Sequence, residues 1–227
     1  MAAAKIILIA ALIAFMAASH GLAADPGPLQ DYCVADYNST VFVNGYACKD
    51  RGLVTADDFF FSGLDKRAST ANRLGSNITI VDATKIPGVN SLGVSMSRID
   101  YAPYGLNPPH AHPRSSEILH VVEGELYAGF VSANTEDGSN LLFAKKLRKG
   151  DVFVFPRGLI HFQFNCGGSR AVAFAAFDSQ KPGLVTIANA MFGAHPAVDD
   201  EVLVKAFQLN EATVDWLQKQ NWLDVST

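Results

Sequence analysis

The short stretch PPHAHPRSSEILHVVEG contains three histidines and two glutamates, residue types that bind metal ions. Residues two apart on a strand point to the same face, so His110 and His112 are expected to project together. Glu117 follows the short turn PRSS and opens the next strand, where its side chain can point back to the same side. His120 has the opposite parity to Glu117, and we interpret it as a packed or surface histidine. The stretch predicts three ligands of a metal site; the simpler alternative is a polar loop before a strand.

A second stretch, GDVFVFPRGLIHFQFN, offers a fourth ligand. His161 follows a Pro-x-Gly turn and opens a strand in which Phe162 and Phe164 alternate with polar residues. The histidine therefore shares the polar face of that strand, and the turn would deliver its imidazole to the interior. Gln163 has the same parity as His161. It is either a group beside the metal that orients bound water or a surface glutamine.

Three imidazoles and one carboxylate form a donor set for a transition metal. A metal that prefers six ligands would keep two positions open for water, oxygen or a small anion. Zinc accepts the same groups, although its closed structural sites are usually four-coordinate and rich in sulfur. A single histidine is more often structural than a ligand, but the two spacings together favour a metal site. The donor types alone do not select manganese, which stands low in the Irving–Williams order.

The part of the chain that carries these residues reads as short strands separated by turns. The segments are rich in Val, Ile, Phe and Tyr, and Gly, Pro, Asn or Asp punctuate most of them. They are GVNSLGVSMSRIDY, SEILHVVEG, ELYAGFVS, NLLFAKKL, DVFVFP, IHFQFN and AVAFAAF. No helical crossover pattern alternates with them, which argues against a parallel α/β sheet. We therefore expect an all-β sandwich or barrel.

The end of the chain changes to helical spacing in residues 199–208 and 210–222. Asp199 or Asp200 can cap the first of these helices, and Asn210 can cap the second. The apolar residues expected to share one face of the first helix are Val202, Ala206 and Leu209. Two helices this small cannot bury their apolar faces alone, so they are expected to pack on the barrel or on a neighbouring subunit.

The beginning of the chain has the composition of a secretory signal peptide. Lys5 precedes an apolar run from Ile6 to Ala18, and small residues follow it. The run is shorter than the ~20 residues that span a bilayer, so a membrane anchor is the weaker alternative, and no later run is long and apolar enough to cross a membrane. We expect cleavage after Ala23 or Ala24 and a soluble, secreted protein.

The formal charge of the chain is −4 at pH 7. Removal of the leader, in which Lys5 is the one charged residue, makes the chain slightly more acidic. A mildly acidic protein is a poor binder of nucleic acids and of anionic membranes, because both carry negative charge.

Cysteines and sequons fit an oxidising compartment. Pairing of Cys33 with Cys48 would close a short loop, worth ~3 kcal/mol in the chain-entropy model. Cys166 is then left over, and we expect a mostly buried free thiol, with intermolecular pairing as the alternative. Asn38 and Asn77 each begin an Asn-x-Ser/Thr sequon without proline, and both are predicted glycosylation sites.

Both metal stretches match the two sequence boxes of the cupin superfamily. The segments DPGPLQDYCVAD, GLNPPHAHPRSSEIL and KGDVFVFPRGLIHFQFN resemble plant germin-like proteins, and the likeness covers almost the entire mature chain. It implies a cupin β-barrel of jelly-roll type with a short C-terminal helical extension. It implies one Mn²⁺ per subunit, held by His110, His112, Glu117 and His161. It also implies the Cys33–Cys48 disulfide. It also implies N-glycosylation, a homohexamer built as a trimer of dimers, and a place in the extracellular space, the apoplast and the cell wall.

Together these features divide the chain into four parts. We expect a signal peptide at 1–24, a disulfide-containing N-terminal segment at 25–57, the barrel at 58–197 and the C-terminal helices at 198–227.

Three functions remain open for such a chain, two of them enzymatic. A superoxide dismutase-type reaction, which would supply hydrogen peroxide and serve plant defence, needs little beyond the metal, an open position and a proton source. Oxalate oxidation needs further donors. The resemblance places one of two expected asparagines at Asn107, but a serine, Ser97, stands where the other is expected. Loss of a hydrogen bond to a charged group removes ~1.5–3 kcal/mol, which disfavours oxalate oxidation. The third is a non-enzymatic wall-associated, storage-like (nutrient reservoir) or ligand-binding protein whose metal is structural.

Overall fold

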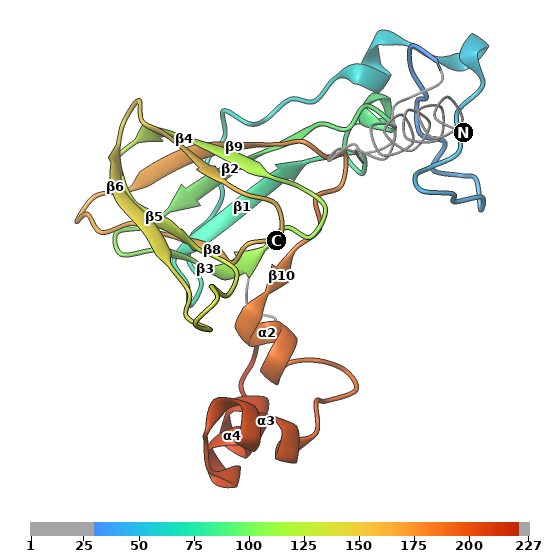
Figure 1. Cartoon of the computed structure of the whole chain (residues 1–227). Coiled ribbons are helices and arrows are strands. Elements are labelled where there is room, and N and C mark those ends of the chain that lie inside the picture. Colours follow the sequence, from blue (N-terminus) through green and yellow to red (C-terminus); the bar gives the residue numbers. More distant parts are fainter. Residues whose placement is uncertain (1–29, 223–227) are drawn as a thin grey trace, which may run out of the picture.

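Two five-stranded antiparallel sheets lie face to face in the computed structural model, which describes residues 30–222 (Figure 1). The strands of the first sheet run in the order β1-β2-β9-β4-β7. They are β1 Ser76–Val81, β2 Ser95–Tyr101, β4 Glu117–Glu123, β7 Val152–Phe155 and β9 Ala171–Phe177. The strands of the second sheet run in the order β10-β3-β8-β5-β6. They are β3 Leu106–Ala111, β5 Glu125–Val131, β6 Leu142–Arg148, β8 His161–Phe164 and β10 Val185–Thr186. The all-β jelly-roll prediction is confirmed.

Each of the seven segments predicted as strands overlaps a strand of the structure, and β3 is the further strand that was expected at His110. The first strand, β1, was not among them, although Ile78 and Ile80 alternate there with polar residues as in a half-buried strand. The two-residue β10 is too short to leave a periodic signal. The predicted signal peptide lies outside the described residues.

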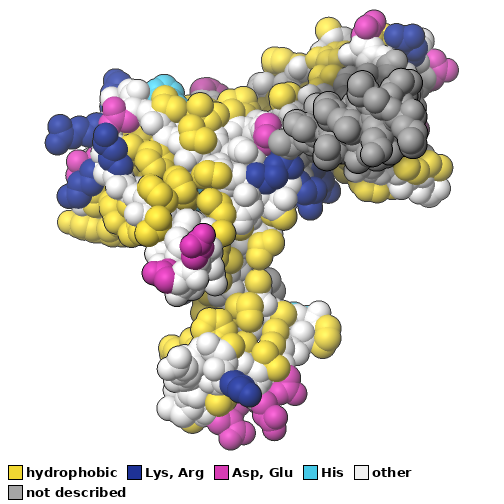
Figure 2. Space-filling model, in the orientation of Figure 1, with side chains coloured by type: hydrophobic (Ala, Val, Ile, Leu, Met, Phe, Trp, Pro, Cys, Tyr) yellow, Lys and Arg dark blue, Asp and Glu magenta, His cyan; other side chains and the backbone are white. Residues whose placement is uncertain are grey.

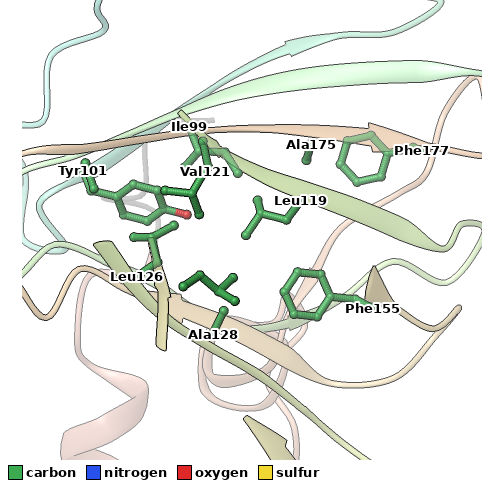
Figure 3. Close-up of a cluster of buried hydrophobic side chains, with 12 residues drawn as sticks. Ile99, Tyr101, Leu119, Val121, Leu126, Ala128, Phe155, Ala175 and Phe177 are labelled. Carbon is green, nitrogen blue, oxygen red and sulfur yellow. The ribbon is translucent and has the colours of Figure 1, made fainter. Parts of the chain in front are cut away.

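The core lies between the sheets and consists of the inward-pointing alternate residues along the strands (Figure 3). Leu119 and Val121 of β4 meet Leu126 of β5, and all three are fully buried. Burial of each such side chain contributes about 1.5–3 kcal/mol relative to exposure. The other members of the cluster are Ile99, Tyr101, Ala128, Leu147, Phe155, Ala171, Ala173, Ala175 and Phe177. This packing holds the two sheets at a fixed separation and therefore fixes the strand ends that carry the candidate ligands.

Three α-helices follow the barrel and extend away from it (Figure 1). They are α2 Ile187–Phe192, α3 Asp200–Phe207 and α4 Glu211–Gln218. The two predicted helices are present, and their caps are Asp199, which accepts from the Glu201 amide, and Asn210. The short α2 was not expected. No helix within the described range is long and apolar enough to cross a membrane.

The face expected to be buried on the first predicted helix does not pack on the barrel; its packing on a neighbouring subunit stays a prediction. Val202 of α3 is 53% exposed, and Ala206 is also exposed, whereas the neighbouring Leu203 is fully buried. The helix is amphipathic, and α3 packs against α4; Leu203 is buried, whereas Val202 and Ala206 face outward.

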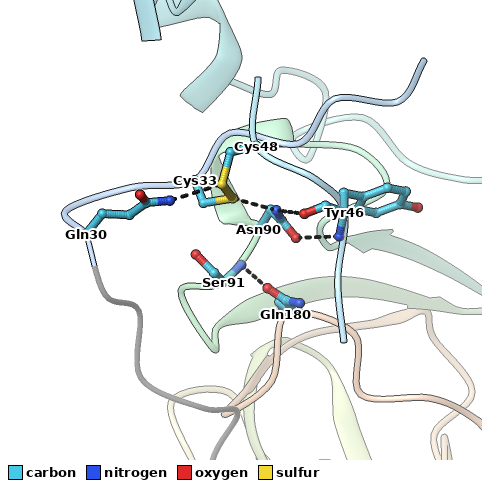
Figure 4. Close-up of a disulfide and its surroundings, with 7 residues drawn as sticks. All are labelled: Gln30, Cys33, Tyr46, Cys48, Asn90, Ser91 and Gln180. Atoms are coloured by element: carbon cyan, nitrogen blue, oxygen red, sulfur yellow. Dashed lines mark hydrogen bonds between the residues drawn. A yellow bond between two sulfur atoms is a disulfide. The ribbon is translucent and has the colours of Figure 1, made fainter. Parts of the chain in front are cut away.

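The N-terminal segment is held by the predicted disulfide between Cys33 and Cys48 (Figure 4). The fully buried Asn90 joins this segment to the rest of the chain, because its Nδ2 donates to Cys33 Sγ at 3.3 Å and to the Tyr46 carbonyl at 2.9 Å. Short 3₁₀ helices complete this end of the molecule: η1 Arg51–Leu53, η2 Ala56–Phe59 and η3 Pro87–Val89. Cys166 is a free thiol, as expected, but only half-buried.

Candidate metal centre

Four residues from three strand ends converge inside the barrel. His110 lies near the end of β3, His112 just beyond that strand, and Glu117 and His161 are the first residues of β4 and β8. Strands β3 and β8 pair with His110 opposite His161, which places those two rings side by side. All four side chains are buried, and their nitrogen and carboxylate oxygen atoms lie within 4.8 Å of one another. The structure thus brings together every residue predicted as a ligand.

Each of the three imidazoles is oriented by a backbone carbonyl. Nδ1 of His110 lies 2.8 Å from the Pro108 carbonyl, and Nδ1 of His112 lies 2.5 Å from the Gly183 carbonyl. Nδ1 of His161 lies 2.9 Å from the Leu159 carbonyl. A carbonyl oxygen can only accept, so Nδ1 of each ring carries the proton. A ring with this single proton keeps its lone pair on Nε2, and hydrogen bonds of this kind fix both tautomer and ring direction at metal sites.

The positions of the Nε2 atoms fit a bound cation. Nε2 of His112 and Nε2 of His161 each lie 3.1 Å from Oε2 of Glu117. In a ring that carries its one proton on Nδ1, the Nε2 lone pair faces the carboxylate oxygen, which is unfavourable unless a positive charge, either a metal ion or a second ring proton, lies between them. The other carboxylate oxygen, Oε1, has no hydrogen-bond partner among residues 30–222. A metal ion would satisfy all of these groups at once.

The protonation states of the cluster also suit a metal. Burial is the main cause that lowers the pKa of His110 from 6.5 to about 3, and the neighbouring His161 and His112 lower it further. Burial alone would raise the pKa of Glu117, but hydrogen bonds that His112 and His161 donate to its carboxylate when they carry a proton on Nε2 outweigh that effect and bring the pKa of the metal-free cluster to about 2. At neutral pH, His110 is therefore neutral and Glu117 is anionic, the forms that bind metals.

Gln163 lies beside the cluster and is fully buried, so the interpretation as a surface glutamine was wrong. On β8 the polar face points inward, whereas Phe162 and Phe164 are only partly buried. Asn107 Nδ2 donates to Gln163 Oε1 at 2.6 Å and holds the amide in place. The Gln163 Nε2 has no hydrogen-bond partner within the described chain. This donor remains available on the buried face of β8 that also carries His161.

A pocket of about 200 Å³ leads to the cluster from outside the barrel. Its inner end is formed by His110, His112 and Glu117, together with Asn107 and Ser97. The pocket is the route by which a small molecule could reach a metal held there.

The remaining predicted residues lie away from this centre. His120 points outward from β4 and is exposed, as its parity predicted. Asn38 is exposed, and Asn77 is half-buried, with its Nδ2 donating to the Ser69 carbonyl at 2.9 Å. Both sequons stay predictions.

Two contributors to the site were missed from the sequence. The Gly183 carbonyl orients His112, although the two residues are far apart in the chain. The isoleucines of β1 line the pocket, and their strand was not predicted. The alternation of Ile78 and Ile80 with polar residues could have revealed that strand, whereas no sequence signal marks the Gly183 carbonyl.

The comparisons with known proteins agree with this geometry. Residues 62–215 match the cupin family profile. Germin-like protein 12-2 of Oryza sativa subsp. japonica is 56% identical over 225 residues, which cover 98% of each chain. Germin-like protein 8-8 of the same plant is 55% identical over 223 residues, which also cover 98% of each chain. The structure of a recombinant oxalate oxidase in complex with glycolate superposes with a TM-score of 0.82 at 44% identity, covering 86% of this chain and 96% of that chain. The chain belongs to the cupin family, among the germin-like proteins.

Proposed function

We propose that the protein is a manganese-binding germin-like protein with superoxide dismutase-type activity that releases hydrogen peroxide outside the cell. The observation that carries this proposal is the buried cluster of three imidazoles and one carboxylate, with Nε2 atoms turned inward, at the end of a pocket. His110, His112, Glu117 and His161 are the proposed ligands of one Mn²⁺ per chain. Manganese suits nitrogen and oxygen donors that leave two of six positions open.

Manganese, when bound, would supply the one-electron redox change by which two superoxide ions and two protons become oxygen and hydrogen peroxide. The residues of the chain would hold and orient the reactants. Asn107 holds Gln163 through the 2.6 Å hydrogen bond, and the Nε2 donor of Gln163, which has no partner among residues 30–222, would orient a small oxygen species or water. Tyr101, whose hydroxyl lies 3.4 Å from Gln163 Oε1, completes this buried polar network.

Oxalate oxidase activity is the second enzymatic candidate, because oxalate oxidase is a close structural neighbour. Oxalate carries two charges and needs donors around both carboxylates. Ser97 lies in the pocket but offers a short hydroxyl in place of an amide, and the isoleucines beside it offer no donor. This arrangement disfavours oxalate, although Asn107 is present.

A non-enzymatic wall-associated, storage-like or ligand-binding protein with a structural metal is the alternative from a different class. The fold and the metal site are compatible with it, because many cupin-like sites could hold a metal without turnover. It predicts that metal binding stabilises the chain while superoxide is removed no faster than by free manganese.

We further propose that the protein is secreted to the apoplast and cell wall and forms a homohexamer. Hydrophobic side chains gather on the surface over β5 and β6 (Figure 2), where Leu142 and Phe143 of β6 are about half exposed. Together with the outward face of α3, these surfaces suit contacts between copies of the chain. N-glycosylation at the exposed Asn38 and at Asn77, and a role in plant defence, belong to the same proposal.

The test is superoxide dismutation by the purified, glycosylated protein, with the rate normalised to manganese measured in the same sample. We expect a rate well above that of free manganese, lost in His112→Ala and retained in His120→Ala, which changes an exposed histidine of β4. A rate no better than free manganese would favour the non-enzymatic alternative. Peroxide release on addition of oxalate would instead favour oxalate oxidase, and its absence would count against that activity.

A further inference from the structure

We propose that the pocket in front of the metal centre binds a small monocarboxylate with an apolar body. The carboxylate would lie toward Ser97 and the metal ligands, and the body against a wall of isoleucines. The inference rests on the proposed function, because it takes the cluster to hold a metal cation. It goes further in naming the chemical class of a bound ligand.

The apolar wall is built by the inner faces of the two strands at one edge of the first sheet. Strands β1 and β2 pair with Ile78 opposite Ile99 and Ile80 opposite Ser97. All four side chains line the pocket, so three branched hydrocarbon groups surround a single hydroxyl. Phe177 adds to the apolar lining at the inner end, where its ring centroid lies 4.9 Å from that of His112, and Leu184 adds to it at the exposed side.

The polar end of the pocket has an unused donor. Ser97 is 1% exposed, and its Oγ has no hydrogen-bond partner among residues 30–222. An unpaired buried hydroxyl costs free energy, so a ligand oxygen that accepts from it would be stabilised. Asn107 and Glu117 line the same end, which places the donor close to the metal ligands. A carboxylate is the group that both a cation and a hydroxyl donor would bind.

The opening of the pocket carries one group of each charge. Lys181 lines the opening and is exposed, so its ammonium can attract an anion from solvent. Asp82 also lines the pocket, but its carboxylate accepts from the Thr84 amide at 2.8 Å and is buried. A singly charged ligand is therefore not repelled at the entrance.

The same lining discriminates against dianions. A second carboxylate would lie against the isoleucines, where it would lose hydration without gaining a donor, and burial of an unpaired charge is strongly unfavourable. A ring or branched chain in the same place would instead gain the hydrophobic contribution of the buried area. An apolar cavity of ~150 Å³ is large enough for benzene, so a pocket of about 200 Å³ can hold an aromatic or branched acid.

The test compares benzoate, acetate and oxalate as probes, by calorimetry on manganese-loaded and metal-free protein. We expect benzoate to bind the loaded protein at least 10-fold more tightly than acetate, and oxalate to bind no more tightly than acetate. Equal affinities for benzoate and acetate, or tighter binding of oxalate, would overturn the inference. Metal content is measured on each sample. A chain that takes up no manganese contradicts the proposed function together with this inference, whereas a loaded chain without the preference for benzoate contradicts this inference alone.

Two variants locate the binding. Ile80→Ser should reduce the benzoate-to-acetate ratio several-fold with little change for acetate, because it removes part of the wall. Ile118→Ser is the matched control, since Ile118 lies on the outer face of β4 and is 48% exposed. Ser97→Ala should weaken both acids by a similar factor. An unchanged ratio in Ile80→Ser would show that the apolar body does not lie against β1 and would overturn the inference.

Discussion

Gly183 is the residue whose substitution tests most sharply how the fold prepares the metal site. It has a φ of +72°, and its carbonyl accepts from Nδ1 of His112 at 2.5 Å. Alanine at this position would adopt a left-handed conformation that costs roughly 1–2 kcal/mol. Its Cβ would also lie 2.7 Å from Nη2 of Arg114. The guanidinium can shift, but Arg114 Nε also donates to the Lys181 carbonyl at 2.9 Å, so the segment that carries the Gly183 carbonyl must adjust.

The expected result of Gly183→Ala is a loss of manganese affinity in addition to a loss of stability. Removing the partner that orients a ligand histidine typically lowers metal affinity 10–100-fold, which corresponds to about 1.4–2.7 kcal/mol. The assay is competition for manganese against a chelator of known affinity, with the free energy of unfolding measured on the same metal-free samples.

Gly138→Ala is the matched control for this experiment. Gly138 has a φ of +81°, and a Cβ there would meet no atom within 4 Å. It carries a similar backbone cost without contact to the centre, so its manganese affinity should equal that of the wild type. If Gly183→Ala and Gly138→Ala bound manganese equally well, the carbonyl of Gly183 would not position His112 and the reasoning would be refuted.

Three further predictions concern stability. Cys48→Ser should lower the free energy of unfolding by ~3 kcal/mol, because the disulfide spans 15 residues; an unchanged urea midpoint would contradict this. Leu119→Ala should lower the free energy of unfolding by about 2–5 kcal/mol, because Leu119 is fully buried. Ile118→Ala on the outer face should change it by less than about 0.5 kcal/mol. Similar losses in the two variants would refute the assigned strand faces. The metal-free protein should lose stability as the pH falls from 6.5 toward 3, because His110 takes up a proton in the unfolded state before it does so in the folded state, where its pKa is about 3. Glu117 acts in the same direction between pH 4.5 and 2. A urea midpoint that does not fall on acidification would contradict both.

Much of the site could be predicted from the sequence because strand parity is a local property. His110, Glu117 and His161 belong to strands whose alternation shows which side chains share a face, and the opposite parity of His120 correctly placed it outside. Parity does not say which face is buried. Gln163 therefore had two interpretations, and only the packing of β8 between β3 and β5 shows that the polar face is the inner one.

The missed features depend on contacts between distant parts of the chain. A carbonyl has no side-chain identity, so nothing in the sequence indicates that Gly183 accepts from His112. Which side of α3 packs within the chain could not be predicted, because Val202 and Leu203 lie on different sides of the helix and the choice between them depends on where α4 packs. Propensity and periodicity describe a helix but not its neighbour.

The most direct measurement is the metal content of the purified protein, by elemental analysis combined with electron paramagnetic resonance. The account predicts one manganese ion per chain in the wild type and in His120→Ala, and a marked loss in Glu117→Gln and His161→Ala under the same loading conditions. Full manganese content in the latter two variants, or a different metal at one equivalent in the wild type, would contradict the assignment of the cluster.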